Sequence, residues 1–447
     1  MMKKLISFTI ILCSIVSATA QQTYSLEQIL EAARQNNVAV RNAQRDVDAA
    51  RQTRKEALTK YFPNISGTGL WFNANRGMAK MNMNPSEMIP PELGAALAQS
   101  LPPEALIALS NPISISMMKN GTIAGVTAMQ PIFAGGQIIN GNKLAKVGEE
   151  VSQLQLQLSE NEVERNAEQY FWQFVSLQEK MKTVQAVEDL LKGLHKDVEV
   201  AVKAGVTMRN DLLQVQLRQN DIESQKVKLQ HGISIVRLLM AQYCGLQDTT
   251  FVLAYDDVAT SPVNLRKDHQ QALLSTSEYQ LLNKQVEATN LQYKMEIGKN
   301  LPSLAVGAGY NYHNLLDNDR TFGMVFASVS VPISDWWGGS HAIKHKKLEK
   351  LKAADQLEND AEMLKIRMIK AWHDVEEAYQ QLEIAERSIE QSEENLRLNK
   401  DFYQAGTITM SDLLQAQLLY QQAKDHRTDA FADYQNKILE YRHSTGE

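Results

Sequence analysis

The sequence feature that most constrains the fold is an internal repeat. The segment AGVTMRNDLLQVQL at 204–217 and the segment AGTITMSDLLQAQL at 405–418 share eight of fourteen positions and lie 201 residues apart. A repeat at a fixed offset duplicates a unit of structure. The chain is therefore expected to contain two similar halves, residues 21–260 and 261–447.

The repeat offset changes along the chain, which locates an insertion. The offset of 201 residues also aligns Pro131 with Pro332. Further upstream, YFPNISGTGLWF at 61–72 matches NLPSLAVGAGYN at 300–311 with an offset of 239. The difference, 239 minus 201, means that the first half carries 38 extra residues between Pro63 and Pro131.

Each half is predicted to contain a helix, two strands, a long helix, a turn and a further helix. In the segment 136–203 apolar residues recur mostly at steps of three and four, the spacing of a coiled-coil seam. A helix of that length spans about 100 Å and must pack against neighbours along most of it. Ser25 and Gln28 fit a capping box at the first helix. The helices are expected at 25–61, 136–203 and 210–245, then at 265–300, 340–404 and 411–443, and the strands at 63–73 and 118–133, then at 302–313 and 321–333.

The strands have the alternation of membrane β-barrels. In SLAVGAGYNYH at 303–313 one face carries apolar residues and the other small or polar ones, which is typical of a transmembrane barrel strand. The return strand alternates less cleanly, and an ordinary soluble hairpin is the alternative. Aromatic residues near strand ends fit two membrane–water interfaces, namely Trp71, Phe72, Phe133, Tyr310, Tyr312, Trp336 and Trp337. Four prolines mark the expected strand–helix junctions, namely Pro63, Pro131, Pro302 and Pro332.

The extra residues fall in the segment 73–117, between two predicted strands. Pro85, Pro90, Pro91, Pro102 and Pro103 preclude a long uninterrupted helix there, although a short helical turn over 92–100 is compatible with them. Long loops of membrane barrels lie on the extracellular side, so the insert is expected there. Its methionines suit Cu(I) binding or flexible packing, and both interpretations stay open. These methionines are Met78, Met81, Met83 and Met88.

The N-terminus and the composition exclude several classes of protein. Residues 1–20 have the basic start, apolar run and small-residue cleavage site of a signal peptide, and no lipid attachment is expected at Cys13. Removal of Lys3 and Lys4 takes the net charge from −6 to −8, which argues against nucleic acid as a partner. Only Cys244 then remains, so neither a disulfide framework nor a thiolate metal cluster is expected. No later stretch is apolar for long enough to form a membrane-spanning helix.

The repeated phrase reads as a tight helix–turn–helix. Gly205 and Gly406 can end the long helices in left-handed geometry. Asn210 and Ser411 are expected to N-cap the following helices. Asp211 and Asp412 would then lie in the first helical turn, stabilised by the positive helix end.

Four strands per chain are too few to close a barrel. Backbone groups facing lipid must be paired, so an open sheet edge cannot remain in the membrane. The chain must therefore oligomerise, and three copies would supply about twelve strands.

These residues and their order resemble the TolC family of outer-membrane efflux and secretion channels. The resemblance implies an α+β membrane protein in the outer membrane of a Gram-negative bacterium. It implies a homotrimer with one 12-stranded β-barrel, four strands per protomer, continued by a long periplasmic α-helical coiled-coil barrel. Implied partners are outer-membrane lipid, a periplasmic adaptor (membrane fusion protein) and an inner-membrane pump of the RND, ABC or MFS class.

The resemblance also gives the hairpin tips a role. In the family such tips form the periplasmic mouth that docks the adaptor, here expected at 205–213 and 406–414, with Gly205, Asp211, Leu212, Gly406, Asp412 and Leu413. Family members often carry two aspartates one helical turn apart as acidic rings at the gate. Asp412 matches the first, whereas Gln415 stands at the second, and Ile408 replaces a basic residue that locks some closed members. Three copies of Asp412 would form a ring that favours cations.

No enzyme, cofactor or metal site is expected. His341 and His345 share a helix face, but Ala342 stands where a zincin needs glutamate, so a solvated basic helix start is the simpler interpretation. The expected function is a passive outer-membrane conduit of a tripartite efflux or type I secretion system. The alternative is a soluble periplasmic coiled-coil adaptor or scaffold without a pore, which the strand alternation disfavours.

Overall fold

The computed structural model describes residues 22–315 and 319–447. The signal peptide predicted at 1–20 and Cys13 lie outside the described residues. Within the described ranges, no helix is both long enough and apolar enough to cross a membrane.

The described chain divides into two compact units, and each unit draws on both repeats. The first unit takes in the described part of Met1–Ala50, with Glu149–Val286 and Ala353–Glu447. The second unit takes in Arg51–Gly148 and Glu287–Lys352. Four helices contribute residues to both units because the chain enters and leaves each unit through them.

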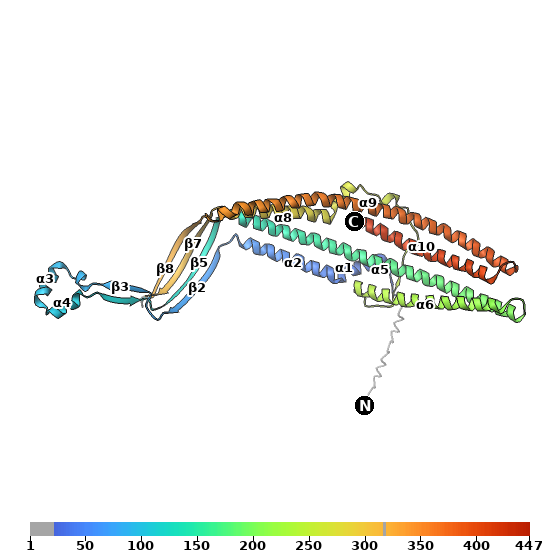
Figure 1. Cartoon of the computed structure of the whole chain (residues 1–447), viewed down its shortest axis with the longest axis horizontal. Coiled ribbons are helices and arrows are strands. Elements are labelled where there is room, and N and C mark those ends of the chain that lie inside the picture. The colour runs from blue at the N-terminus through green and yellow to red at the C-terminus, as the bar shows by residue number, and fades with distance from the viewer. Residues whose placement is uncertain (1–21, 316–318) are drawn as a thin grey trace, which may run out of the picture. The chain divides into compact units, whose positions relative to one another are not determined.

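The first unit is a bundle of long helices (Figure 1). Its longest members, α5 with 67 residues and α9 with 70, each form a hairpin with the helix that follows. A helix of that length runs about 100 Å, as expected from the number of residues predicted for it. The elements are β1 Thr23–Tyr24, α1 Leu26–Asn36, α5 Gln137–Lys203, α6 Arg209–Cys244, β6 Val252–Leu253, a 3-10 turn at Pro262–Leu265, α7 His269–Ser275, α9 Asp335–Gln404 and α10 Met410–Ser444.

The main core of this unit joins helices of both repeats. Phe171 and Phe174 of α5 are fully buried, and Trp372 of α9 packs edge-on against Tyr441 of α10 with ring centroids 5.1 Å apart. The parallel pair β1–β6 lies beside this core, and the ring of Phe251, directly before β6, contacts Phe174. Burial of several aromatic rings contributes much of the apolar area that holds the bundle together.

The first helix of each repeat is broken once, which corrects the predicted single helices at 25–61 and 265–300. α1 ends at Asn37, where the backbone is extended (φ −67°, ψ 137°), and α2 Val38–Thr59 follows. α7 ends in the same way at Thr276 (φ −67°, ψ 138°), and α8 Ser277–Lys299 follows. The two breaks lie 239 residues apart, the repeat offset of this region, so the break belongs to the repeated unit. The capping box predicted at Ser25 and Gln28 is confirmed.

Side-chain capping explains both breaks. Asn37 Oδ1 accepts from Ala39 N–H at 2.8 Å, and Asn37 Nδ2 donates to the Tyr243 carbonyl at 3.2 Å. Thr276 Oγ1 donates to the Leu273 carbonyl at 2.8 Å. These bonds satisfy backbone groups that an interrupted helix would leave unpaired.

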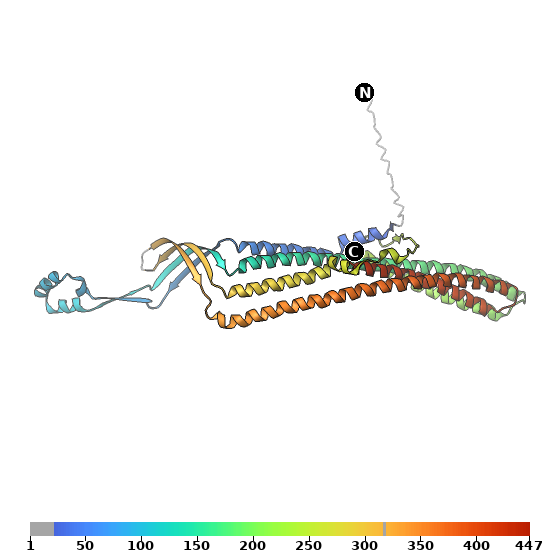
Figure 2. The same cartoon turned by 90° about the horizontal axis from the view of Figure 1, so that it is seen from above.

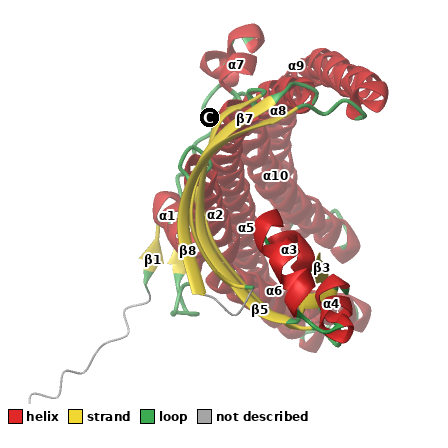
Figure 3. Cartoon of the chain, turned by 90° about the vertical axis from the view of Figure 1, so that its left-hand side faces the viewer, coloured by secondary structure: helices red, strands yellow, loops and turns green. Residues whose placement is uncertain are grey.

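The second unit contains a curved four-stranded antiparallel sheet (Figure 3). The strand order is β2–β5–β7–β8, so β2 and β8 are its edges. Their bounds are β2 Asn64–Asn73, β5 Asn120–Ala134, β7 Ser303–Asn314 and β8 Asp319–Ser330, within two to three residues of the prediction at most ends. The repeats therefore meet at β5 and β7, the two central strands.

The register gives the sheet one strongly apolar face. Antiparallel partners share a face, and successive residues alternate between faces. Apolar residues dominate one face, namely Ile65, Trp71, Ala124, Val126, Ala128, Phe133, Leu304, Val306, Ala308, Tyr310, Tyr312, Val325, Ala327 and Val329. The other face is mixed, with Ser66, Thr68, Thr127, Asn311 and His313 beside Phe322, Met324 and Phe326. The aromatic residues on that face cover glycine: a Cβ at Gly307 would lie 2.4 Å from Phe326 Cζ.

The insert between β2 and β5 folds as a small piece of its own. It contains β3 Ala79–Met83, a 3-10 turn at Pro85–Met88, α3 Pro91–Ser100, α4 Pro103–Ser110 and β4 Ile113–Met117. The helical turn expected at 92–100 is confirmed as α3, whereas the antiparallel β3–β4 ribbon was not predicted. The ribbon continues away from the sheet, with α3 and α4 at its far end (Figures 1 and 2).

One of the four predicted strand–helix junctions needs correction. Pro63 and Pro302 directly precede strands, and Pro332 follows β8, as predicted. Pro131 instead lies inside β5, where the ladder to β7 shifts register between Pro131 and Phe133. A β-bulge tolerates proline because it already interrupts the hydrogen-bond ladder.

The two tryptophans predicted near a strand end belong to a helix. α9 begins at Asp335 rather than near 340, so Trp336 and Trp337 lie in its first turn. Trp336 Nε1 donates to the Asn300 carbonyl at 2.9 Å, and Trp337 is exposed.

Candidate functional site

Both hairpins turn through the same backbone geometry. α5 ends at Lys203 and α9 at Gln404, and the glycine two residues later, Gly205 or Gly406, has φ of 73°. In each turn the glycine N–H donates to the carbonyl three residues back, and the following N–H donates to the carbonyl five residues back. That pair of bonds is a Schellman ending, so the prediction of left-handed helix ends at both glycines is confirmed.

The second tip is capped by Thr409, not by Ser411 as predicted. Asp412 N–H donates to Thr409 Oγ1 at 3.3 Å, and Thr409 N–H donates to Asp412 Oδ2 at 2.9 Å. The reciprocal pair is a capping box that satisfies two backbone donors. Its hydrogen bonds, first from the Thr409 hydroxyl and then from its backbone, hold the pKa of Asp412 below its ordinary value.

The first tip lacks such a cap, and the prediction of Asn210 as its N-cap is wrong. α6 begins at Arg209, and its N-cap residue Met208 has no side-chain acceptor. Asp211 lies in the first turn, as predicted, but its carboxylate accepts from the hydroxyl of Thr207 in the turn. The helix therefore starts without a side-chain cap, although Asp211 N–H donates to the Met208 carbonyl at 3.1 Å.

The tips of the two hairpins pack together at one end of the first unit (Figures 1 and 2). Met410 and Leu413 of α10 are buried with Val198 of α5 and Val215 of α6. Leu212 is partly buried against the same cluster. The structure thus brings Leu212 and Leu413, predicted from separate repeats, to one apolar cluster behind the turns.

The first tip exposes apolar side chains in its turn, whereas the second tip buries Met410 at the start of its helix. Val206 is 80% exposed and Met208 is 76% exposed, whereas Met410 is 1% exposed. Leu213 and Leu217 on α6 are also exposed. These apolar side chains are therefore in contact with solvent at the first tip.

Asp412 and Gln415 are both exposed and lie three residues apart, on one face of α10. Asp412 points one oxygen at the Thr409 cap, which leaves its second oxygen outside the capping box. The residues expected at the gate are therefore accessible, and the negative charge is held by a lowered pKa.

Sequence reasoning missed a polar ladder between α6 and α10, behind the tip cluster. Arg218 donates to Gln417 Oε1 at 3.2 Å and to Gln421 Oε1 at 2.6 Å. Gln421 in turn donates to Gln225 at 2.8 Å, and burial lowers the pKa of Arg218. Gln417 and Gln421 are both nearly fully buried and lie close to apolar positions of the repeated phrase. Their position among apolar residues is the sequence signal that could have predicted this polar ladder. A buried polar network of this kind fixes the register of two helices, although Gln417 Nε2 itself has no hydrogen-bond partner in the described chain.

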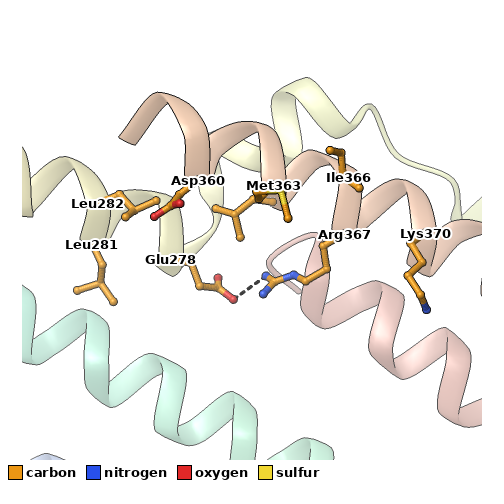
Figure 4. Close-up of a pocket in the computed structure, with 9 residues that line it drawn as sticks. Glu278, Leu281, Leu282, Asp360, Met363, Ile366, Arg367 and Lys370 are labelled. Carbon is orange, nitrogen blue, oxygen red and sulfur yellow. Dashed lines mark hydrogen bonds and ion pairs between the residues drawn. The ribbon is translucent and has the colours of Figure 1, made fainter. Parts of the chain in front are cut away.

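Two grooves follow the bundle. One, of about 440 Å³, lies behind the tips between α5, α9 and α10 and is lined by Leu190, Leu194, Leu396 and Leu414 with charged rims. The second, of about 750 Å³, lies between α8 and α9, where Leu281, Leu282 and Met363 line it and Arg367 pairs with Glu278 at 2.8 Å (Figure 4). Both are open apolar surfaces suited to helices rather than enclosed sites for a small molecule.

The predicted interface aromatics separate by face. Trp71, Phe133, Tyr310 and Tyr312 lie on the apolar face of the sheet. Phe72 lies on the opposite face, where its ring covers Gly121. Phe72 therefore departs from the group with which it was predicted.

The candidate metal ligands have other neighbours. His345 Nδ1 lies 3.6 Å from Glu349 Oε1 on its own helix. Met81 and Met83 stand directly opposite Ile115 and Ile113, which suits packing. Within the described part of the chain no group of three or more His, Cys, Asp or Glu side chains gathers as metal ligands.

Cys244 is fully buried at the end of α6. Burial raises the pKa of its thiol to about 12. A thiol so placed is inert and acts as a small apolar residue, as predicted.

Solved outer-membrane channels share this fold. The Campylobacter jejuni CmeC outer membrane channel matches with a TM-score of 0.75 and 13% identity, over 94% of this chain and 85% of its own. The outer membrane protein VceC of Vibrio cholerae matches with a TM-score of 0.73 and 12% identity, over 94% and 96%. The Neisseria gonorrhoeae MtrE outer membrane channel matches with a TM-score of 0.71 and 13% identity, over 94% and 88%. At these identities the likeness establishes the fold. No curated protein matches the sequence.

The chain thus has the fold of TolC-like outer-membrane channels, in which a bundle of long helices accompanies a β domain. Residues 269–447 match the family described as outer membrane efflux protein. The second half of the chain thus matches the outer membrane efflux protein family, and the chain as a whole has the fold of solved outer-membrane channels. That family is one of channels, not of enzymes.

Proposed function

We propose that three copies of this chain pool their sheets into one 12-stranded barrel, a passive conduit across the outer membrane. The observation that carries the proposal is the four-stranded sheet with two free edges, β2 and β8, and one apolar face. Four strands cannot close on themselves, and an open edge in lipid leaves backbone groups unpaired. Pairing β2 of one copy with β8 of the next removes every edge.

The height of the apolar face supports a membrane position. Across the sheet, Trp71 of β2 is level with Asn314 of β7. Phe133 of β5 pairs with Leu304 of β7, ten residues from Asn314. Ten residues of strand span about 33 Å, which a tilt of about 40° reduces to the ~25 Å of an outer-membrane apolar band. Aromatic residues then lie near both rims of the band.

In this proposal the helical unit lies in the periplasm and its tips dock an adaptor, which links the channel to an inner-membrane pump of the RND, ABC or MFS class. The exposed Val206 and Met208 of the first tip offer the apolar contact for an adaptor helix. The second tip, with Asp412 and Gln415 exposed, lines the gate. Three copies of Asp412 form one negative ring, because the lowered pKa keeps each carboxylate ionised.

The barrel proposal is tested by two neighbouring residues that face opposite ways. Val325, 86% exposed, lies on the apolar face, and Met324 lies on the mixed face. Val325→Arg places a charge in lipid at a cost of about 2–4 kcal/mol per copy, so trimers in the outer membrane should be lost. Met324→Arg faces the lumen and should leave trimers in place.

Heat-modifiable migration of extracted outer membranes measures the trimer for both variants. Equal loss of trimer in the two variants, or equal retention, would contradict the assignment of lipid and lumen faces.

A further inference from the structure

The ribbon in the insert has one face made only of apolar residues. β3 and β4 pair in register, so that their residues alternate between two faces. The apolar face carries Ala79, Met81, Met83, Ile113, Ile115 and Met117, while Lys80, Asn82 and Ser114 lie on the other. Ser114 donates a hydrogen bond to Asn82 across the polar face.

Most of the apolar face is open to solvent in the described chain, and only Met83 and Met117 are partly covered. Met81, Ile113 and Ile115 are each exposed by 41% or more, and none of the described side chains of residues 74–119 is buried. Leu93 on α3 and Ile107 on α4 are exposed as well. An isolated two-stranded ribbon is marginal in water, so this face gains most from a partner that removes it from solvent.

Charge favours a second copy of the insert as that partner. Residues 74–119 hold three basic and three acidic residues, namely Arg76, Lys80, Lys119, Glu87, Glu92 and Glu104. Copies with zero net charge do not repel one another. A phosphate-bearing lipid surface would instead call for a basic patch.

Position points to the same partner. The insert leaves the sheet from β2, the edge strand that meets the next copy in the proposed barrel. Figure 3, which views the sheet end on, shows α3 and α4 on the concave side of the sheet. In a closed barrel the concave side surrounds the axis, where the inserts of three copies converge.

We propose that the apolar ribbon faces of the three inserts pack against one another and form a cap above the outer mouth of the barrel. This inference rests on the trimer of the proposed function. Six prolines restrict the insert before it docks, which lowers the entropy cost of association. Methionine beside isoleucine gives the face adaptable packing.

The proposal is tested by cysteine crosslinking in intact outer membranes with a short bismaleimide. Ile115→Cys should give a crosslinked band of two copies, and the third copy of each trimer should remain as monomer because one crosslink joins only two thiols. Ser114→Cys is the matched control, because the adjacent residue is also exposed but faces the other way, and it should remain monomeric on denaturing gels. Cys244 is fully buried and should add no background.

The outcomes separate the cap from the trimer. A trimer with native migration but without crosslinks at Ile115→Cys, and also at Ile113→Cys as a second position, overturns the cap and leaves the barrel standing. Loss of the trimer in the unmodified protein overturns the barrel itself. Crosslinks of equal yield at Ser114→Cys, or crosslinks only to other proteins, also overturn the cap.

Discussion

The two hairpin tips share one backbone and present two different surfaces. Gly205 and Gly406 adopt the same φ and the same pair of turn hydrogen bonds. Around them, the first tip exposes Met208, whereas the second buries Met410 and caps its helix through Thr409. Duplication has therefore kept the residues that shape the turn and changed those that decide what the turn contacts.

Two aligned pairs account for most of the difference. Thr409 stands where the first repeat has Met208, so only the second tip has a hydroxyl cap. Met410 stands where the first repeat has Arg209, so only the second tip inserts an apolar side chain into the cluster shared by the hairpins. The first tip is thus free for a partner, while the second is fixed to its own bundle.

The largest effect is expected at Met410. Met410→Ala empties a buried position and should lower the local free energy of unfolding by about 2–5 kcal/mol. Arg209→Ala, its counterpart, is exposed and should change stability by no more than about 0.5 kcal/mol. Hydrogen exchange of residues 405–416 and 204–215 measures both, and equal losses would break the distinction between the tips.

The two glycines should respond alike, with the next largest effect. A Cβ at Gly205 or Gly406 meets nothing within 4 Å, so only the left-handed backbone penalises alanine. Each Gly→Ala change should destabilise its turn by about 1–2 kcal/mol. Gly193→Ala, in the interior of α5 and with the same open space, should instead stabilise by up to about 1 kcal/mol. Hydrogen exchange in the two turns should shift equally, and a clear inequality would refute a shared geometry.

Removal of the helix cap from the second tip and its introduction into the first should have smaller effects on stability. Thr409→Ala removes the capping hydroxyl and should cost about 1 kcal/mol. Met208→Thr supplies one to a helix whose third residue is already Asp211, and should stabilise the first tip by a few tenths to about 1 kcal/mol. Thermal unfolding monitored by limited proteolysis at each turn compares the two, and destabilisation by Met208→Thr would count against the alignment of the caps.

The pH response of the cap is the smallest expected effect. The pKa of Asp412 is lower in the folded protein than its ordinary value of 3.8, so its contribution is present above pH 3.8 and is lost as pH falls through the folded pKa. The stability difference between the native protein and Thr409→Ala should therefore shrink between neutral pH and about pH 3. A difference that grows with acidification would show that the carboxylate does not act through this cap.

Much of the architecture could be predicted from the sequence because the internal repeat and the long helical periodicities are strong sequence patterns. The repeated phrase predicted the position of both turns. Its glycine predicted the left-handed end of each long helix, and its aspartate, six residues later, predicted the first turn of the following helix. The alternation at 303–313 identified β7, and the change of offset located the insert.

The features that sequence reasoning missed depend on contacts between distant segments. The break at Asn37 is stabilised by the Tyr243 carbonyl, 206 residues away. No proline or glycine lies at the break, so the local sequence does not predict it. The N-caps shifted because the helices begin directly after the turns. The β3–β4 ribbon escaped notice since prolines and methionines dominate the insert and its alternating stretches are only five residues long.

The central claim is that one chain supplies too few strands to seal itself in lipid. Native mass spectrometry of the mature protein, extracted from outer membranes in a mild detergent, counts the copies in one particle. The account predicts three copies that stay together only while detergent or lipid covers the apolar sheet face. A single copy that remains dissolved without detergent would contradict it.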